Sequence, residues 1–173
     1  MEHEVQKHGT VRAPIQYIVE GGHRLKGAIE PSGNKNSALP IIAAALLTEH
    51  PVTLDNVPRI RDTETLVELI RSVGAEAEWR GRNRLAIHAK DIRAADLDPD
   101  LCARIRASIL LAGPLLARCG EVGLPPPGGD VIGRRRLDPH LDAFRTLGAR
   151  VEERRDDIEL TAPPLGLRPC DFL

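Results

Sequence analysis

The stretch SVGAEAE at residues 72–78 recurs as TLGARVE at residues 146–152, about 74 residues further along the chain. In both copies a glycine separates a helical pattern from an alternating run, as expected where a helix ends and a strand begins. A second pair of similar stretches, LAIHA at residues 85–89 and IELTA at residues 158–162, follows these copies. The chain is therefore predicted to contain two copies of one α/β unit, each reading helix, strand, helix, strand, strand.

The elements predicted around these stretches give the chain an α/β (α+β) organisation. The first copy is predicted to contain strands at 16–20 and 26–30, a helix at 35–47, a strand at 51–57, a helix at 63–73 capped by Asp62, and a hairpin of strands 75–79 and 85–89. The second is predicted to contain a helix at 101–118, a strand at 122–124, a helix from Asp138 to Leu147, and a hairpin of strands 149–153 and 158–161. We accordingly expect a disordered leader at 1–14, a first repeat at 15–99 and a second repeat at 100–173.

Composition argues against several classes of function. The 24 basic and 25 acidic side chains leave a formal net charge of −1, and aromatic residues make up 2% of the chain. A nucleic-acid partner is not expected, because the chain has neither a basic field nor a set of rings for base stacking. The cysteines and histidines lack the spacing of a metal site, so no metal is expected. No apolar run reaches the roughly 18 residues of a membrane helix, so we expect a cytoplasmic protein without a membrane partner.

The irregular loop at residues 124–137 lies where the second copy differs most from the first. It holds three prolines and three glycines, which exclude a regular helix or a central strand. The corresponding link in the first copy is the short run 56–61. An insertion at one position of a repeated scaffold favours a binding face. The alternative is a solvated basic surface loop.

Two further positions suggest anion binding. Lys35 and Asn36 begin the first predicted helix, after a turn in which Ser32 or Asn34 can be the N-cap. A helix N-terminus offers unpaired N–H groups and a partial positive charge, so a lysine and an amide there suit a phosphate. The alternative is a solvated surface lysine. Arg106 lies in an otherwise apolar predicted helix, where an arginine requires solvent or an anionic partner.

Four separate motifs give the chain a specific resemblance. They are SGNKNSALP at residues 32–40, RASI at 106–109, GPL at 113–115 and PGGDVIG at 127–133. In this order they resemble the UDP-N-acetylglucosamine 1-carboxyvinyltransferases, a family of enolpyruvyl transferases. The resemblance runs from about Tyr17 to the end of the chain.

This resemblance implies a reaction and a fold. The family transfers enolpyruvate from phosphoenolpyruvate to the 3′-hydroxyl of UDP-N-acetylglucosamine and releases phosphate, in peptidoglycan precursor synthesis and without a cofactor. Its fold has two domains, each an inverted α/β barrel of three βαβαββ-like repeats, with the active site between them. The chain would hold two of the three repeats of one domain. With the third repeat and the second domain absent, we expect a truncated form without turnover by itself.

The resemblance also implies roles for particular residues. Asp130, Lys35 and Arg135 would be catalytic. Lys35 would contact phosphoenolpyruvate and Asn36 the sugar nucleotide, whereas Asp138 and His140 fall on the uridine-binding segment. The full implied substrate-binding set is Lys35, Asn36, Arg106, Arg135, Arg136, Leu137, Asp138 and His140. Arg136 departs from the family, which commonly has proline there.

Asp130 occupies the loop position at which many family members have a cysteine. That cysteine acts as the general acid and is the target of the epoxide antibiotic fosfomycin. A carboxyl group can protonate the enol methylene if its pKa is raised, although the neighbouring arginines lower that pKa unless loop closure excludes water. A carboxylate is a poorer nucleophile than a thiolate, so the resemblance implies resistance to fosfomycin.

Two other functions remain open at this stage. A non-catalytic module could hold a sugar nucleotide, or associate with itself through the sheet edge left without a third repeat. The related enolpyruvylshikimate-phosphate synthases share the fold, but the loop at residues 127–133 is the mark of the sugar-nucleotide enzymes.

Overall fold

The computed structural model describes residues 16–94, 97–129, 136–154 and 157–170, in two compact units, Met1–Glu30 and Pro31–Leu173. In the first unit the described residues form neither helix nor strand, so the strands predicted at 16–20 and 26–30 are wrong. The apolar side chains in these two stretches are exposed, Ile18 by 88% and Ile29 by 93%. A strand requires a neighbour that accepts and donates its backbone hydrogen bonds, and residues 16–30 have no strand partner in the described part of the chain.

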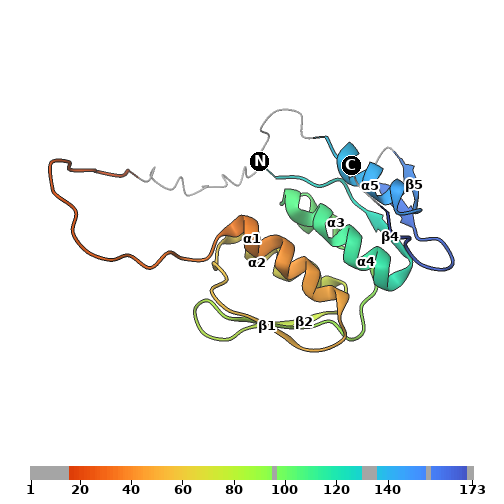
Figure 1. Cartoon of the computed structure of the whole chain (residues 1–173), viewed down its shortest axis with the longest axis horizontal. Helices are drawn as coiled ribbons and strands as arrows, with labels where there is room; N and C mark the ends of the chain where they lie inside the picture. The colour runs from red at the N-terminus through yellow and green to blue at the C-terminus, as the bar shows by residue number, and fades with distance from the viewer. Residues whose placement is uncertain (1–15, 95–96, 130–135, 155–156, 171–173) are drawn as a thin grey trace, which may run out of the picture. The chain divides into compact units, whose positions relative to one another are not determined.

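The second unit contains the regular elements (Figure 1). Its first half consists of α1 (Lys35–Ala44), the 3₁₀ helix η1 (Ala45–Leu47), β1 (Val52–Leu54), α2 (Arg61–Ser72), β2 (Glu76–Trp79) and β3 (Leu85–His88). Its second half consists of α3 (Pro99–Cys102), the 3₁₀ helix η3 (Arg106–Leu111), α4 (Ala112–Cys119), β4 (Glu121–Leu124), α5 (Asp138–Thr146), β5 (Arg150–Glu153) and β6 (Ile158–Thr161). Within the described ranges, no helix is both long and apolar enough to cross a membrane.

The strands form two antiparallel sheets with the same topology. The first sheet has the order β1-β3-β2 and the second β4-β6-β5, so the last strand of each half lies in the middle. Val52 pairs with Ile87 in the first sheet, and Val122 pairs with Leu160 in the second. This correspondence matches the internal similarity of the sequence and confirms the α/β fold class.

The core forms where the helices pack against these sheets. The apolar face of α2, formed by Leu66, Leu69 and Ile70, is fully buried, and so is Val73 at the C-cap of this helix. Helix α2 contacts α1 and β2, whereas α4 contacts β4 and the central strand β6. Figure 1 shows α1 and α2 beside β1 and β2. Burial also raises the pKa of the Cys102 thiol to about 11, as expected for a structural cysteine.

The single helix predicted at residues 101–118 is wrong, because the chain breaks there into three short helical elements. Ile105 is extended, with φ −137° and ψ 140°, and separates α3 from η3. Pro114 does not cause this break, because it lies further along the chain, in the first turn of α4, where a proline is tolerated. The carbonyl of Cys102 instead accepts a hydrogen bond from the N–H of Gly128, at 3.0 Å. The break brings the start of the proline-rich loop against η3.

One arginine connects the two halves of this unit. Arg118, near the end of α4, donates to the backbone carbonyls of Leu46 at 2.9 Å, Ala89 at 2.7 Å and Lys90 at 3.0 Å. Its side chain is only 15% exposed. A guanidinium has five donors in a fixed geometry, so one side chain satisfies several carbonyls at the ends of first-half elements.

Candidate functional site

A cavity of about 660 Å³ lies among α1, α2, the link between α3 and η3, and the start of the proline-rich loop. Four of its lining side chains are cationic and one is acidic, so it suits an anionic ligand. The lining residues are Lys35, Asn36, Leu39, Arg61, Asp62, Ala103, Arg104, Ile105, Arg106, Ala107, Ile109, Leu110 and Gly129.

The start of α1 positions Lys35 and Asn36 at this cavity. Asn34 is the N-cap, and its side chain accepts a hydrogen bond from the N–H of Asn36 at 2.8 Å, which confirms one of the two predicted caps. Gly33 lies so close to the carbonyl of Asn56 that a Cβ would overlap it. Glycine is therefore required for the turn that starts the helix beside the link to α2.

Lys35 pairs with Asp62 of α2. The ammonium Nζ lies 2.7 Å from the carboxylate Oδ2, and the two side chains are 47% and 37% exposed. Asp62 is not the N-cap predicted from the sequence, because α2 begins at Arg61, two residues before the predicted start, after an extended Ile60. The carboxylate of Asp62 is therefore available to hold the lysine at the edge of the cavity.

Arg106 begins η3 and is half-buried in the cavity wall. Its guanidinium donates to the backbone carbonyl of Arg136 at 3.4 Å, which links the cavity to the segment after the loop. Ser108 is buried, and its hydroxyl donates to the carbonyl of Ile105 at 3.1 Å. This is the back-bond to the preceding turn expected of a serine in such an element.

The proline-rich loop is anchored at two glycines. A Cβ at Gly128 would overlap the carbonyl oxygen of Ala103, so only glycine fits at this approach. Gly129 has φ +91°, a left-handed conformation that favours glycine, and it lines the cavity. Asp130 and Arg135, for which the resemblance implies catalytic roles, lie outside the described residues.

The segment after the loop does not line the cavity. The guanidinium of Arg136 donates two hydrogen bonds, of 2.8 and 2.7 Å, to the carboxylate of Asp138. The Arg136 guanidinium lowers the pKa of the Asp138 carboxyl, and the carboxylate raises the pKa of Arg136 in turn. Leu137 packs against the core and His140 is exposed. Asp138 begins α5 without capping it, because Leu137 occupies the N-cap position and makes no side-chain cap bond.

Sequence reasoning missed Arg61, Asp62 and Arg104 as lining residues. The link 56–61 offered a signal for Arg61, because it is the first-copy counterpart of the long loop. The sequence predicts Asp62 to be a helix cap, a role that gives no indication of its contact with Lys35. Arg104 follows α3 at a chain break that the sequence did not predict.

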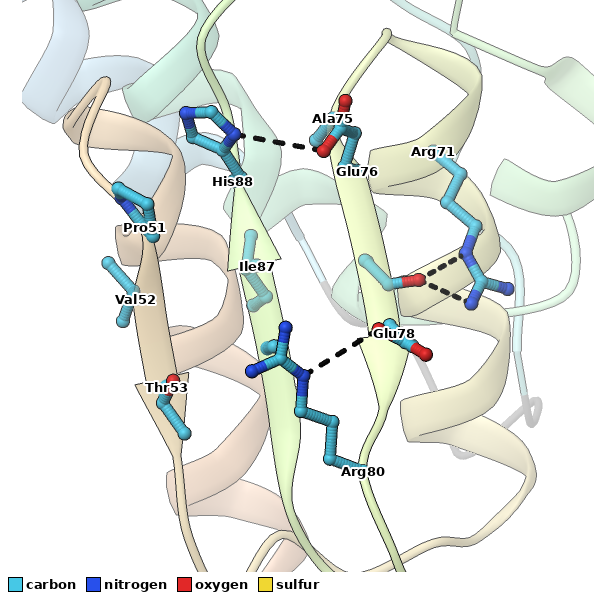
Figure 2. A pocket seen from close by; sticks show the side chains of 12 residues that line it. Pro51, Val52, Thr53, Arg71, Ala75, Glu76, Glu78, Arg80, Ile87 and His88 are labelled. Carbon is cyan, nitrogen blue, oxygen red and sulfur yellow. Dashed lines mark hydrogen bonds and ion pairs between the residues drawn. The ribbon is translucent and has the colours of Figure 1, made fainter.

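A second hollow, of about 490 Å³, lies on the sheet β1-β3-β2 and contains none of the predicted site residues. Figure 2 shows His88 beside Glu76 and Arg80 beside Glu78, with N···O distances of 3.7 and 3.6 Å. Arg71 donates to the carbonyl of Ala77. Because these opposite charges pair with one another, this hollow lacks the cationic excess of the cavity at Lys35.

Comparison with known proteins places the chain in a family. Residues 19–167 match the family model of EPSP synthase (3-phosphoshikimate 1-carboxyvinyltransferase), so the chain belongs to this family of carboxyvinyl transferases. Within it, the chain is 82% identical over 153 residues to the UDP-N-acetylglucosamine 1-carboxyvinyltransferase of Bradyrhizobium diazoefficiens, a match that covers 88% of this chain and 35% of the relative. The Treponema denticola protein of the same name is 50% identical over 137 residues, covering 79% of this chain and 32% of the relative.

A solved structure gives the same assignment. The enolpyruvyl transferase NikO from Streptomyces tendae superposes with a TM-score of 0.71 and 32% sequence identity, covering 87% of this chain and 32% of that one. The resemblance inferred from the four sequence motifs is thus confirmed at the level of the family and of its sugar-nucleotide members. The chain spans about a third of the length of the curated relatives it matches.

Proposed function

We propose that this chain provides part of the site at which enolpyruvate is transferred from phosphoenolpyruvate to the 3′-hydroxyl of UDP-N-acetylglucosamine, with release of phosphate. The reaction is a cytoplasmic step of peptidoglycan precursor synthesis and so bears on cell shape and cell division. The observation that supports this most directly is that Lys35 and Asn36 of α1, Arg106 of η3 and Gly129 of the proline-rich loop line one cavity. These are the residues of three separate sequence motifs.

Each group has a role in this proposal. The Lys35 ammonium binds the phosphoenolpyruvate phosphate, and Asn36 donates its side-chain amide to the sugar nucleotide. Arg106 stabilises the anionic substrates near the loop. Asp130 protonates the enol methylene, and Arg135 contacts both substrates. The segment at residues 136–140 contributes Arg136, Leu137, Asp138 and His140 to the uridine side of the site.

Removing the cation at Lys35 is expected to weaken phosphoenolpyruvate binding about tenfold, because a charge-assisted hydrogen bond to phosphate is lost. Lys35→Gln and the wild-type chain are titrated with phosphoenolpyruvate in the presence of UDP-N-acetylglucosamine and followed by two-dimensional NMR. Lys90→Gln, an exposed lysine away from the cavity, is the control. Equal affinities for Lys35→Gln and Lys90→Gln would contradict the assignment of Lys35.

An assay of phosphate release measures whether the chain alone catalyses the reaction. Among the described lining residues, Asp62 is the only carboxylate, and it is paired with Lys35. No described lining residue is therefore free to act as general base for the sugar hydroxyl. We expect substrate binding without turnover from the chain assayed alone, and clear phosphate release would contradict this.

Fosfomycin is expected to leave the chain unmodified, because the Asp130 carboxylate attacks an epoxide far more slowly than a thiolate would. Intact-mass spectrometry after incubation with fosfomycin and UDP-N-acetylglucosamine measures the outcome. The Asp130→Cys variant restores the thiol and is expected to gain one adduct. Rapid formation of an adduct on Asp130 itself would show that the predicted resistance is wrong.

Self-association is a further part of this proposal. Each of the two described sheets has outer strands, and an outer strand can pair with a strand of another copy of the chain. Sedimentation at increasing protein concentration would measure it, and a monomer at all concentrations would contradict it.

A further inference from the structure

We propose that Arg61 is an additional anion-binding residue of this cavity and acts as the first-copy counterpart of Arg135. The inference rests on the proposed function, since it assigns a second arginine to the same substrates. It begins from three observations: the place of Arg61 in the cavity wall, its place in the internal repeat, and its place in α2.

Arg61 faces the cavity with its charge uncompensated. It lines the cavity together with Lys35, Arg104 and Arg106. No hydrogen bond or ion pair joins the Arg61 side chain to any residue in the described ranges, whereas Lys35 is already paired with Asp62. An exposed arginine can remain solvated, but one at a concave cationic wall adds its field to that of its neighbours.

When the two copies of the repeat are aligned, Arg61 corresponds to Arg135, for which the family resemblance implies a catalytic role. Helix α2 ends at Ser72 and α5 ends at Thr146, the two residues that align at the start of the repeated stretches. Counting back from these ends without a gap, Arg61 and Arg135 both stand 11 residues earlier (72 − 61 and 146 − 135). Arg71 and Arg145 align in the same way, which supports the ungapped count. The duplicated scaffold thus carries an arginine at this position in both copies.

Stability does not explain an arginine at this place in α2. Arg61 is the first residue of a 12-residue helix, where the partial positive charge of the N-terminus disfavours a cation. Lys35 stands at the same disfavoured position of α1, and both line one cavity. Positions at which local preference is overridden are expected at functional sites.

The negative charge of the proposed substrates explains why several cationic side chains line the cavity. A phosphate monoester carries a charge of about −1.5 to −2 at neutral pH, and the proposed substrates add a carboxylate and a diphosphate. Asp62 offsets part of the charge of Lys35. An arginine with free donors can bind a phosphate with two parallel hydrogen bonds, which a lysine cannot do.

The test compares neutral and conservative substitutions in the whole 173-residue chain. Arg61→Gln removes the charge, Arg61→Lys keeps it, and Arg82→Gln changes an exposed arginine in the β2–β3 turn. Each variant is titrated with phosphoenolpyruvate in the presence of UDP-N-acetylglucosamine by NMR, and its melting temperature is recorded. Arg61→Gln is expected to weaken binding about tenfold with a melting temperature equal to or above wild type. Arg61→Lys is expected to recover part of the affinity.

Each outcome decides the question. If the wild-type chain binds and Arg61→Gln binds as Arg82→Gln does, the role of Arg61 is overturned while the proposed function stands. A lower melting temperature together with unchanged affinity would assign Arg61 to the fold and also overturn the inference. If the wild-type chain binds neither substrate, the proposed function and the inference both fail.

Discussion

Gly128→Ala is expected to lower the free energy of unfolding by about 1–3 kcal/mol and to weaken phosphoenolpyruvate binding more than tenfold. The added methyl would overlap the carbonyl oxygen of Ala103, so the backbone on one side has to move. That movement breaks the hydrogen bond from Gly128 to the carbonyl of Cys102, at 3.0 Å. Because Gly129 follows in the chain and lines the cavity, a shift of the backbone at Gly128 also displaces part of the cavity wall.

Gly123→Ala is the matched control for this substitution. Nothing lies within 4 Å of a Cβ at Gly123, which is an exposed position of β4. This control should be neutral or slightly stabilising, since alanine loses less backbone entropy on folding than glycine. Urea unfolding followed by circular dichroism measures both variants. Equal stability of Gly128→Ala and Gly123→Ala would contradict the proposed anchor.

Arg118→Met is expected to destabilise the chain by about 2–4 kcal/mol. The substitution keeps much of the length of the side chain but removes every donor to the carbonyls of Leu46, Ala89 and Lys90. Buried acceptors that lose a charged donor recover little from an apolar side chain. The loss falls on the contact between the two halves of the second unit.

The control for Arg118 is an arginine without such contacts. Arg82→Met alters an exposed side chain in a turn and should change the free energy of unfolding by less than about 0.5 kcal/mol. Both variants are unfolded in urea, and the spectroscopic signal is recorded at several wavelengths. A similar midpoint and slope for the two would show that Arg118 does not join the halves.

Local patterns in the sequence were sufficient for much of the fold. The glycine inside each repeated stretch, Gly74 and Gly148, predicted where the preceding helix ends, and α2 and α5 end two residues before these glycines. The strands at 16–20 and 26–30 were wrong because a period of two identifies a strand only when another strand pairs with it. The helix at 101–118 was wrong because the chain breaks at the extended Ile105, where no glycine or proline signals a helix end.

The site was predictable where a motif fixes the position of a residue along the chain. Asn34, Lys35 and Asn36 follow from the turn and the helix that begins there, and the cavity includes the last two. Asp62 could not be found in this way, since its 2.7 Å contact with Lys35 joins residues from two helices. Arg118 was missed for the same reason, because its partners lie in the other half of the chain.

The most direct test of the proposed function is a comparison of two ligands by isothermal titration calorimetry. The whole chain is titrated separately with UDP-N-acetylglucosamine and with shikimate 3-phosphate at equal concentrations. If the cavity serves enolpyruvyl transfer to the sugar nucleotide, titration with UDP-N-acetylglucosamine gives a saturable binding isotherm, whereas titration with shikimate 3-phosphate gives none. Saturable binding of shikimate 3-phosphate, with none of UDP-N-acetylglucosamine, would contradict the proposed substrate.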